Sequence, residues 1–163
     1  DRNDFNEDTT LSRKKFKRLV IGEYVRLRSG YVIRADEVIK DAAGEIVELI
    51  CSYIPGTVGQ DPPEGVRPRG VIHWVSATNS VDCDLYLYEK LFTVAAPDAG
   101  EGSFIDHLNP DSLQIVKQCK AELGLAVATA GQHFQFEREG YYCVDVVHSS
   151  PEKLVFNRTI ALR

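Results

Sequence analysis

The stretch YVRLRSGYVIRADEVIKDAAGEIVELICSYI, residues 24–54, constrains the fold more than any other part of the chain. β-Branched and aromatic residues dominate it, and these residue types favour strands over helices. Apolar and charged side chains alternate in YVRLR, as they do when one face of a strand is buried. DAAGE interrupts the run, and Gly44 can adopt the positive φ of a tight turn. We therefore expect an antiparallel hairpin formed by residues 25–40 and 45–54.

The rest of the chain continues this pattern of short strands separated by turn signals. Residues 55–70 are rich in Gly and Pro and predict a loop. Residues 96–112 predict a second loop and the best internal boundary, while AELGLAVATA, residues 121–130, fits either a strand or a helix. Many short strands with turns between them are typical of all-β barrels and sandwiches. Further strands are expected in VIHWVSA, CDLYLYEKLF, LQIVKQCKAEL, HFQFEREGYYCVDVV and KLVFNRTIAL.

Charge is distributed unevenly along the chain. The 163 residues have a formal net charge of -5, yet residues 13–34 contain eight basic side chains and a single acid, Glu23. That window therefore has a charge of +7 and the remainder -12. A basic face on an acidic body indicates nucleic-acid binding, although a solvated charged surface would have the same composition.

Length and composition exclude several classes of protein. A chain of this size fits one domain or two small ones. No window approaches the roughly 20 apolar residues of a membrane span, and the polar N-terminus is not a signal peptide. The four cysteines are far apart and form no C-x-x-C pair, so we expect reduced thiols in a cytoplasmic protein and no metal site. Because the sequence does not begin with Met, we expect a fragment.

The familiar catalytic motifs are missing from the sequence. It contains no phosphate-binding glycine loop, no dinucleotide fingerprint, no H-E-x-x-H helix and no G-x-S-x-G elbow. A hydrolase that uses Cys143 and His148 as a nucleophile pair is the enzymatic alternative, but nothing in the sequence orients one toward the other. We therefore expect no catalytic residue in this chain.

The residue types that read single-stranded RNA are present. Such RNA is recognised with its bases unstacked on aromatic or guanidinium planes and bonded at their edges. Lys17-Arg18, VRLR and FQFER supply cations, aromatic rings and an amide that both donates and accepts. The simpler interpretation of the last motif is that Phe134 and Phe136 are core residues and that Gln135 points to solvent.

Six stretches also match one family in sequence and in order. They are KRLVIGEYVRLRSGYVIRADEV, RGVIHWVSA, LYEKLFTV, LNPDSL, FQFEREGYYCVD and EKLVFNRTIALR. Together they resemble the C-terminal anticodon-binding region of bacterial glutaminyl-tRNA synthetases. The resemblance implies two antiparallel β-barrels of the ribosomal L25-like type. After an irregular segment at residues 1–15, residues 16–95 would form the distal barrel and residues 96–163 the returning strands of an incomplete proximal barrel.

The resemblance assigns anticodon contacts to four cations in the first half of the chain. Lys17 and Arg18 match the KR pair that reads the third anticodon base. Arg26 and Arg28 match the VRLR arginines at the first base and its backbone. This chain departs from the family after VRLR, because Ser29-Gly30 stands where the family often has Asn-Ala.

Two further roles fall on the second half of the chain. Gln135 matches the glutamine of FQFER that reads the central uridine, and Arg138 matches the arginine that holds this nucleotide or its phosphate. In an ideal strand these two side chains would lie on opposite faces. A bend or bulge near residues 137–140 is needed to bring both to one nucleotide.

The resemblance also implies what surrounds this region in the family. A class I catalytic domain, outside this chain, uses ATP with Mg²⁺ to join glutamine to its tRNA in the cytoplasm. The expected partners are therefore glutamine tRNA and that catalytic domain, with no membrane, no DNA and no cofactor in this chain. Two alternatives remain open: the anticodon-binding domain of a related glutamyl-tRNA synthetase, and a stand-alone L25-like barrel that binds rRNA.

Overall fold

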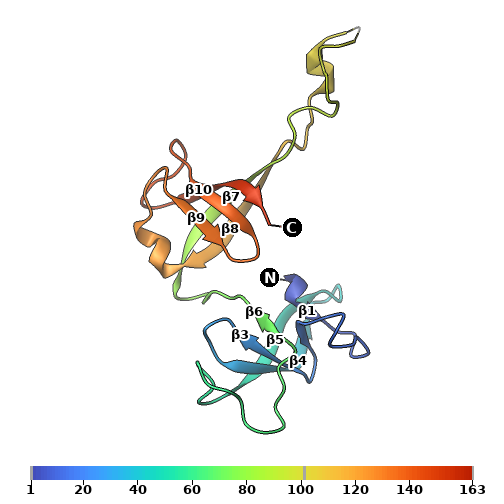
Figure 1. Ribbon diagram of the computed structural model, residues 1–163, viewed down its shortest axis with the longest axis vertical. Helices are drawn as coiled ribbons and strands as arrows, with labels where there is room; N and C mark the ends of the chain where they lie inside the picture. Colours follow the sequence, from blue (N-terminus) through green and yellow to red (C-terminus); the bar gives the residue numbers. More distant parts are fainter. Residues whose placement is uncertain (1, 101, 163) are drawn as a thin grey trace. The chain divides into compact units, whose positions relative to one another are not determined.

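The chain folds into short strands joined by turns and 3-10 helices, and the computed structural model describes residues 2–100 and 102–162. No α-helix occurs among these residues, which confirms the all-β prediction. The chain divides into two compact units, Asp1–Trp74 and Val75–Arg163 (Figure 1). No helix within the described ranges is long and apolar enough to cross a bilayer.

The first unit is built on a four-stranded sheet with the order β5-β4-β3-β6. β4 pairs antiparallel with both β3 and β5, while β6 runs parallel to β3. A 3-10 helix, η1, leads into a separate parallel pair, β1-β2. The elements are η1 Arg2–Asp4, β1 Phe5–Asn6, β2 Leu19–Val20, β3 Tyr24–Leu27, β4 Val32–Lys40, β5 Ile46–Ile54 and β6 Val71–Ile72.

The predicted hairpin is present, but its first strand is shorter than expected. β4 and β5 pair antiparallel around the DAAGE turn, where Gly44 has a φ of 84°. The chain does not continue as one strand through residues 25–40, because a turn at residues 28–31 separates β3 from β4. Ser29 lies in the left-handed region of that turn with a φ of 54°, a conformation incompatible with a regular strand.

Apolar side chains from every layer of the first unit meet in one cluster. Its buried members are Phe5, Leu19, Val25, Ala35 and Ile72. They come from β1, β2, β3, β4 and β6, so the short parallel pair packs against the same core as the main sheet. Burial of this apolar area is the main favourable term in holding the elements together.

The second unit contains a five-stranded sheet with the order β8-β7-β11-β10-β9. Its inner pair, β7 and β11, is parallel, and the other pairings are antiparallel. Within the described residues, strand pairing closes neither this sheet nor the four-stranded one into a ring. The elements are β7 Ser80–Tyr88, η2 Phe104–His107, β8 Leu113–Glu122, η3 Leu123–Val127, β9 His133–Phe136, β10 Gly140–Val144 and β11 Leu154–Ala161.

The second unit begins earlier than the boundary expected after residue 95. β7 forms a ladder with β8 and a second ladder with β11, so it is part of the sheet of the second unit. Because these pairings are non-local, turn signals in the sequence do not reveal them. The ambiguous segment 121–130 forms the end of β8 and then the 3-10 helix η3.

The core of the second unit is rich in aromatic rings. Phe136 stacks on Tyr142 with ring centroids 4.5 Å apart, and it meets Phe156 edge to face at 5.1 Å. Phe134 meets Phe156 at 6.2 Å in a T-shaped contact. These rings tie β9, β10 and β11 together, and aromatic pairs of this kind stabilise a core beyond the area that they bury.

Candidate nucleic-acid interface

Lys17 and Arg18 immediately precede β2, in a segment that packs closely against the start of β6. The turn before them is closed by two backbone N–H groups that donate to the carbonyl of Ser12, each at 3.0 Å. A Cβ atom on Gly70 would lie 2.2 Å from the carbonyl oxygen of Lys17. Glycine is therefore required at position 70. The Lys17 side chain in this segment is exposed.

Two groups from η1 hold the guanidinium of Arg18. Its Nε lies 3.1 Å from Oδ1 of Asp4, and its Nη1 donates to the carbonyl oxygen of Asn3 at 2.9 Å. The Asp4 side chain is only 4% exposed, whereas that of Arg18 is 39% exposed. Arg18 thus has one edge anchored in the protein and part of its surface open to solvent.

Arg18 lies at the wall of an open groove of about 710 Å³ in the first unit. Clefts of this size accommodate small ligands. The other lining residues include one cation, two amides and two aromatic rings, the types that hold an unstacked base, together with the acid Glu7. They include Arg2, Asn3, Asn6, Phe5 and Phe16.

Arg26 is engaged with the protein itself. Its guanidinium donates to the carbonyl oxygens of Thr57 and Gln60, the latter at 2.7 Å. Thr57 is buried, and its hydroxyl donates to Ile54 at 2.7 Å and accepts from the N–H of Val32 at 2.9 Å. Arg26 therefore supports the loop that follows β5, and its contact with a base remains a prediction.

Arg28 is exposed at the start of the turn between β3 and β4. Its backbone is fixed on both sides, because its N–H donates to Ile72 at 2.8 Å and its carbonyl accepts from Nε1 of Trp74 at 3.0 Å. Trp74 is itself exposed. A cation and an indole ring therefore lie at the same turn.

Gln135 and Arg138 belong to the hairpin formed by β9 and β10. Phe134 and Phe136 pack against the core cluster, and Gln135 between them is exposed, as the alternation predicts. The N–H of Glu139 donates to the carbonyl of Phe136 at 3.0 Å and closes the turn.

The bend expected near residues 137–140 is present in this hairpin. Arg138 lies at the tip with a φ of 69°. The pairing of β10 with β11 shifts register between Tyr141 and Tyr142. The convergence of Gln135 and Arg138 on one nucleotide remains a prediction.

Sequence reasoning missed several residues beside the predicted ones. Tyr141 pairs directly with Gln135 across β9 and β10 and is 42% exposed, so a flat ring lies next to the amide. Once the register of β9 and β10 is known, the alternation in FQFEREGYY predicts that Tyr141 lies beside Gln135. Asp4 and Phe16, in contrast, lie in a polar stretch whose packing depends on non-local contacts, and no sequence signal marks them.

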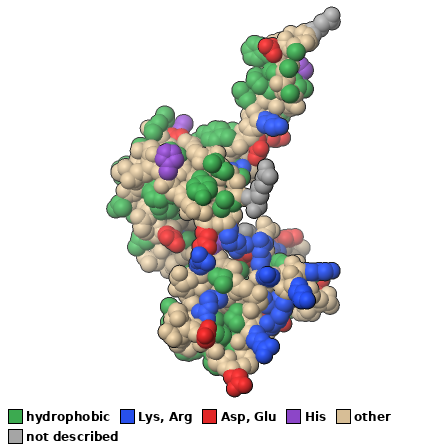
Figure 2. All heavy atoms as spheres, viewed as in Figure 1, with side chains coloured by type: hydrophobic (Ala, Val, Ile, Leu, Met, Phe, Trp, Pro, Cys, Tyr) green, Lys and Arg blue, Asp and Glu red, His purple; other side chains and the backbone are tan. Residues whose placement is uncertain are grey.

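Positive charge gathers on the first unit. Figure 2 shows Lys and Arg side chains clustered over this unit on the face in view. The Asp1–Trp74 sequence has twelve basic and twelve acidic residues, whereas Val75–Arg163 has seven basic and twelve acidic ones. Some of the basic residues are structural: Arg13 binds Glu23 and the carbonyl of Arg67.

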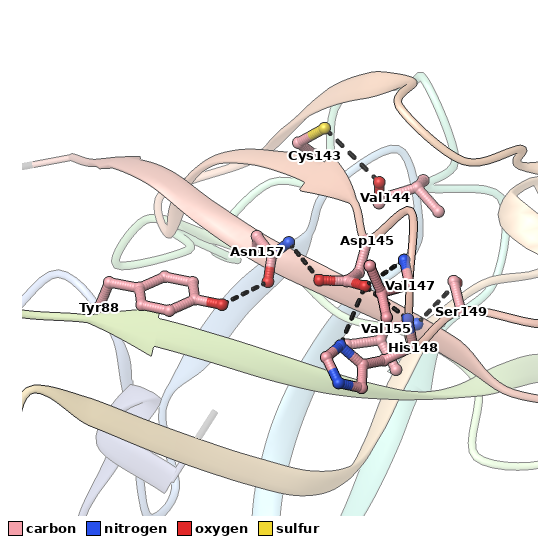
Figure 3. A network of polar contacts seen from close by, with 9 residues as sticks. All are labelled: Tyr88, Cys143, Val144, Asp145, Val147, His148, Ser149, Val155 and Asn157. Atoms are coloured by element: carbon pink, nitrogen blue, oxygen red, sulfur yellow. Dashed lines mark hydrogen bonds and ion pairs between the residues drawn. The ribbon is translucent and has the colours of Figure 1, made fainter.

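Cys143 and His148 do not form a nucleophile pair. The Cys143 thiol donates to the carbonyl of Val144 at 3.6 Å, whereas Nδ1 of His148 lies 3.1 Å from Asp145 (Figure 3). Asp145 accepts from the backbone N–H groups of Val147 and His148. These hydrogen bonds hold the segment after β10 in place, and the Cys143 thiol does not contact the His148 imidazole through any of them.

The same network extends into β11 and β7. Asn157 donates to Asp145 at 2.7 Å and accepts from the hydroxyl of Tyr88 at 3.1 Å (Figure 3). Burial opposes ionisation of Asp145, but the hydrogen bonds from His148, Asn157 and Val147 outweigh it and lower the pKa to about 2. Among the described residues, no group of three or more His, Cys, Asp or Glu side chains is placed to hold a metal ion.

Known proteins similar to this chain include glutamine--tRNA ligases of several bacteria. Glutamine--tRNA ligase of Ectopseudomonas mendocina is 57% identical over 150 residues, which cover 91% of this chain and 27% of that protein. The ligase of Pseudomonas putida is 53% identical over 165 residues, or 100% of this chain and 28% of that protein. The ligase of Psychromonas ingrahamii is 53% identical over 164 residues, or 100% of this chain and 29% of that protein. The chain therefore spans less than a third of the length of these relatives.

Two family models also match, and both are described as "tRNA synthetases class I (E and Q), anti-codon binding domain". One matches residues 1–54 and the other residues 71–145, so together they cover most of both units. This confirms the resemblance drawn from the sequence motifs. The chain belongs to the anticodon-binding domain family of the class I glutamyl- and glutaminyl-tRNA synthetases.

Proposed function

We propose that this chain recognises the anticodon loop of glutamine tRNA as part of a larger glutamine–tRNA ligase. Identity of 53% over the whole chain to ligases of that name supports the assignment. The geometric observation that carries it is the hairpin of β9 and β10. There an exposed amide, Gln135, alternates with two rings anchored in the core, beside a turn that presents Arg138.

Recognition would combine base reading with backbone positioning. The Gln135 amide can both donate and accept, so it can match the edge of an unstacked uridine. Arg18, with its guanidinium held at the groove, would read the third base together with Lys17. Arg28 would contact the first base or its backbone, and Arg138 would hold the central nucleotide or its phosphate. Arg26 would act at the first base only by leaving the carbonyls that it now binds. Base contacts specify and phosphate contacts position.

The rest of the enzyme would supply the chemistry. We propose that a catalytic domain outside this chain uses ATP with Mg²⁺ to attach glutamine, in the cytoplasm, and that this domain is the second partner of the chain. No step of that reaction is assigned to residues of this chain. Its own contribution is selection of the tRNA.

A glutamate-specific enzyme is the second candidate, because the family models describe both specificities. The three relatives are all named for glutamine, which favours the first candidate. RNA hairpins with the glutamine or the glutamate anticodon separate the two. Tighter binding to the glutamate hairpin would reverse the assignment.

The first test uses the 163-residue chain and an RNA hairpin with the glutamine anticodon. Gln135→Ala should weaken binding to this hairpin about tenfold or more, and should weaken binding to a hairpin altered at the central base far less, because each good base contact contributes about 1–3 kcal/mol of discrimination. Fluorescence anisotropy titrations measure both affinities.

The matched control is Gln114→Ala, which removes an exposed glutamine from β8. It should leave both affinities unchanged. Equal losses on the two hairpins for Gln135→Ala would contradict base reading and leave only general electrostatic attraction.

A further inference from the structure

The buried carboxylate of Asp4 lies beside the partly exposed guanidinium of Arg18 at the groove of the first unit. Asp4 is 4% exposed, and its Oδ1 lies 3.1 Å from Nε of Arg18. Burying a carboxylate is costly unless a cation or hydrogen bonds compensate for the lost water. The Arg18 guanidinium provides this compensation, so the two side chains hold each other in place.

The second anchor of Arg18 fixes the plane of its guanidinium. Nη1 donates to the carbonyl oxygen of Asn3 at 2.9 Å, at a different nitrogen from the one facing Asp4. Two contacts to different nitrogens of a planar group determine its orientation. These contacts use Nε and one N–H of Nη1, so the second N–H of Nη1 and both N–H groups of Nη2 can donate to an acceptor outside the protein.

The groove beside this guanidinium suits a single nucleotide. Its volume is about 710 Å³, and Phe16 adds a ring to a lining that also contains Arg2, Asn6 and the acid Glu7. An unstacked base needs aromatic or guanidinium planes for its faces and fixed polar groups for its edges. A guanidinium of set orientation discriminates between bases, because the fork matches only acceptors placed at the correct angle.

We propose that Asp4 is a positioning residue for RNA recognition: it fixes the guanidinium of Arg18 so that its remaining N–H groups read the nucleotide in this groove. The inference rests on the proposed function. Asp4 does not touch RNA itself. Its removal leaves the charge of Arg18 in place but releases the guanidinium, so that discrimination falls while electrostatic attraction persists.

The experiment compares Asp4→Asn with Arg18→Ala in the 163-residue chain. Each is titrated with the glutamine hairpin and with a hairpin altered at the third anticodon base, and the ratio of the two affinities measures discrimination. Asp4→Asn should lower this ratio about tenfold, close to the loss caused by Arg18→Ala, because a good contact is worth about 1–3 kcal/mol. In the double variant, Asp4→Asn should cause no further loss.

The control variant is Asp8→Asn, which alters an exposed carboxylate in the same segment that accepts from Thr10. It makes the same change in net charge, so it reveals any gain in RNA affinity from charge alone. It should leave the discrimination ratio unchanged.

A measurement on the unaltered chain guards against misfolding of the variants. The Nε–H resonance of Arg18 should exchange with water at least roughly tenfold more slowly than that of the exposed Arg67, before any RNA is added, because an ion-paired group beside a buried carboxylate opens rarely. Rapid exchange at Arg18 would overturn the proposal without any substitution.

The outcomes separate this inference from the proposed function. Discrimination that is lost in Arg18→Ala but retained in Asp4→Asn removes the role of Asp4 and leaves the proposed function standing. The proposed function is overturned if Arg18→Ala still discriminates at the third base and Gln135→Ala still discriminates at the central base. The positioning role of Asp4 falls with it.

Discussion

At the residue scale, the chain contains carboxylates whose environments give them different tasks. Asp4 is buried beside the Arg18 guanidinium at the edge of a groove, whereas Asp145 is buried among hydrogen-bond donors in the connection between β10 and β11. Both are unremarkable acids in the sequence. Their different surroundings arise from packing, which places a guanidinium at one and four donor groups at the other.

Asp145 should make the stability of the second unit depend on acid pH. Its pKa is about 2 in the folded chain, against 3.8 as the ordinary value, so the unfolded chain binds a proton more readily. The stabilisation is therefore present above about pH 4 and is lost as the pH falls toward about 2. In Asp145→Asn, the deficit in free energy of unfolding relative to wild type should shrink over this window.

Urea unfolding at a series of pH values measures this deficit. Asp111→Asn, which removes an exposed carboxylate from the same unit, is the matched control. A deficit of constant size from about pH 7 to about pH 2 would show that Asp145 acts only through its shape and not through its charge.

At the element scale, the turn between β3 and β4 contains Ser29-Gly30, where the resemblance predicted a departure from the family. Ser29 has a φ of 54°, and Gly30 is buried against Leu27 and Trp74. A Cβ atom on Gly30 would lie 3.1 Å from Cβ of Leu27 and 3.3 Å from Nε1 of Trp74. The glycine thus permits close packing of the indole, while serine occupies a backbone conformation that it tolerates poorly.

Ser29→Asn should stabilise the chain, because asparagine adopts the left-handed region more readily than serine. The expected gain is about 0.5–1 kcal/mol in the free energy of unfolding, the size of effect typical of a substitution that suits the local backbone. Urea unfolding measures it. Ser29→Ala serves as the control, since alanine has no preference for this region, and a gain of the same size in both variants would contradict the backbone explanation.

At the scale of the whole molecule, the two units differ in charge. Basic and acidic residues balance in Asp1–Trp74, whereas acids exceed bases by five in Val75–Arg163. An acidic body with a local basic surface disfavours arbitrary RNA while keeping attraction where contacts are specific. Electrostatic attraction to RNA should therefore originate in the first unit.

Replacing Lys14 and Lys15 with glutamine should reduce the salt dependence of RNA binding. Removal of one phosphate contact should lower the slope of log affinity against log salt by about 0.7 for a single strand. Binding titrations at several salt concentrations measure the slope. Lys90→Gln with Lys117→Gln makes the same charge change in the second unit, and an equal fall in slope there would contradict the localisation.

The all-β class, the β4-β5 hairpin and the family could all be predicted from the sequence. Alternation, turn residues and short motifs are local properties, readable without knowing which strands meet. The sequence also predicted that Gln135 lies outside and its neighbouring phenylalanines inside, because strand periodicity is local too.

Which segments pair, and what surrounds each side chain, became known from the three-dimensional structure alone. It assigned β7 to the second unit, because that strand pairs with β8 and β11, which lie far along the chain. It also revealed that Asp4 forms an ion pair with Arg18 and that Arg26 donates to carbonyl oxygens of the loop after β5. The contacts of Arg18 and Arg26 join residues separated by 14 to 34 positions, and their energies depend on burial and on partner geometry, neither of which a local sequence pattern contains.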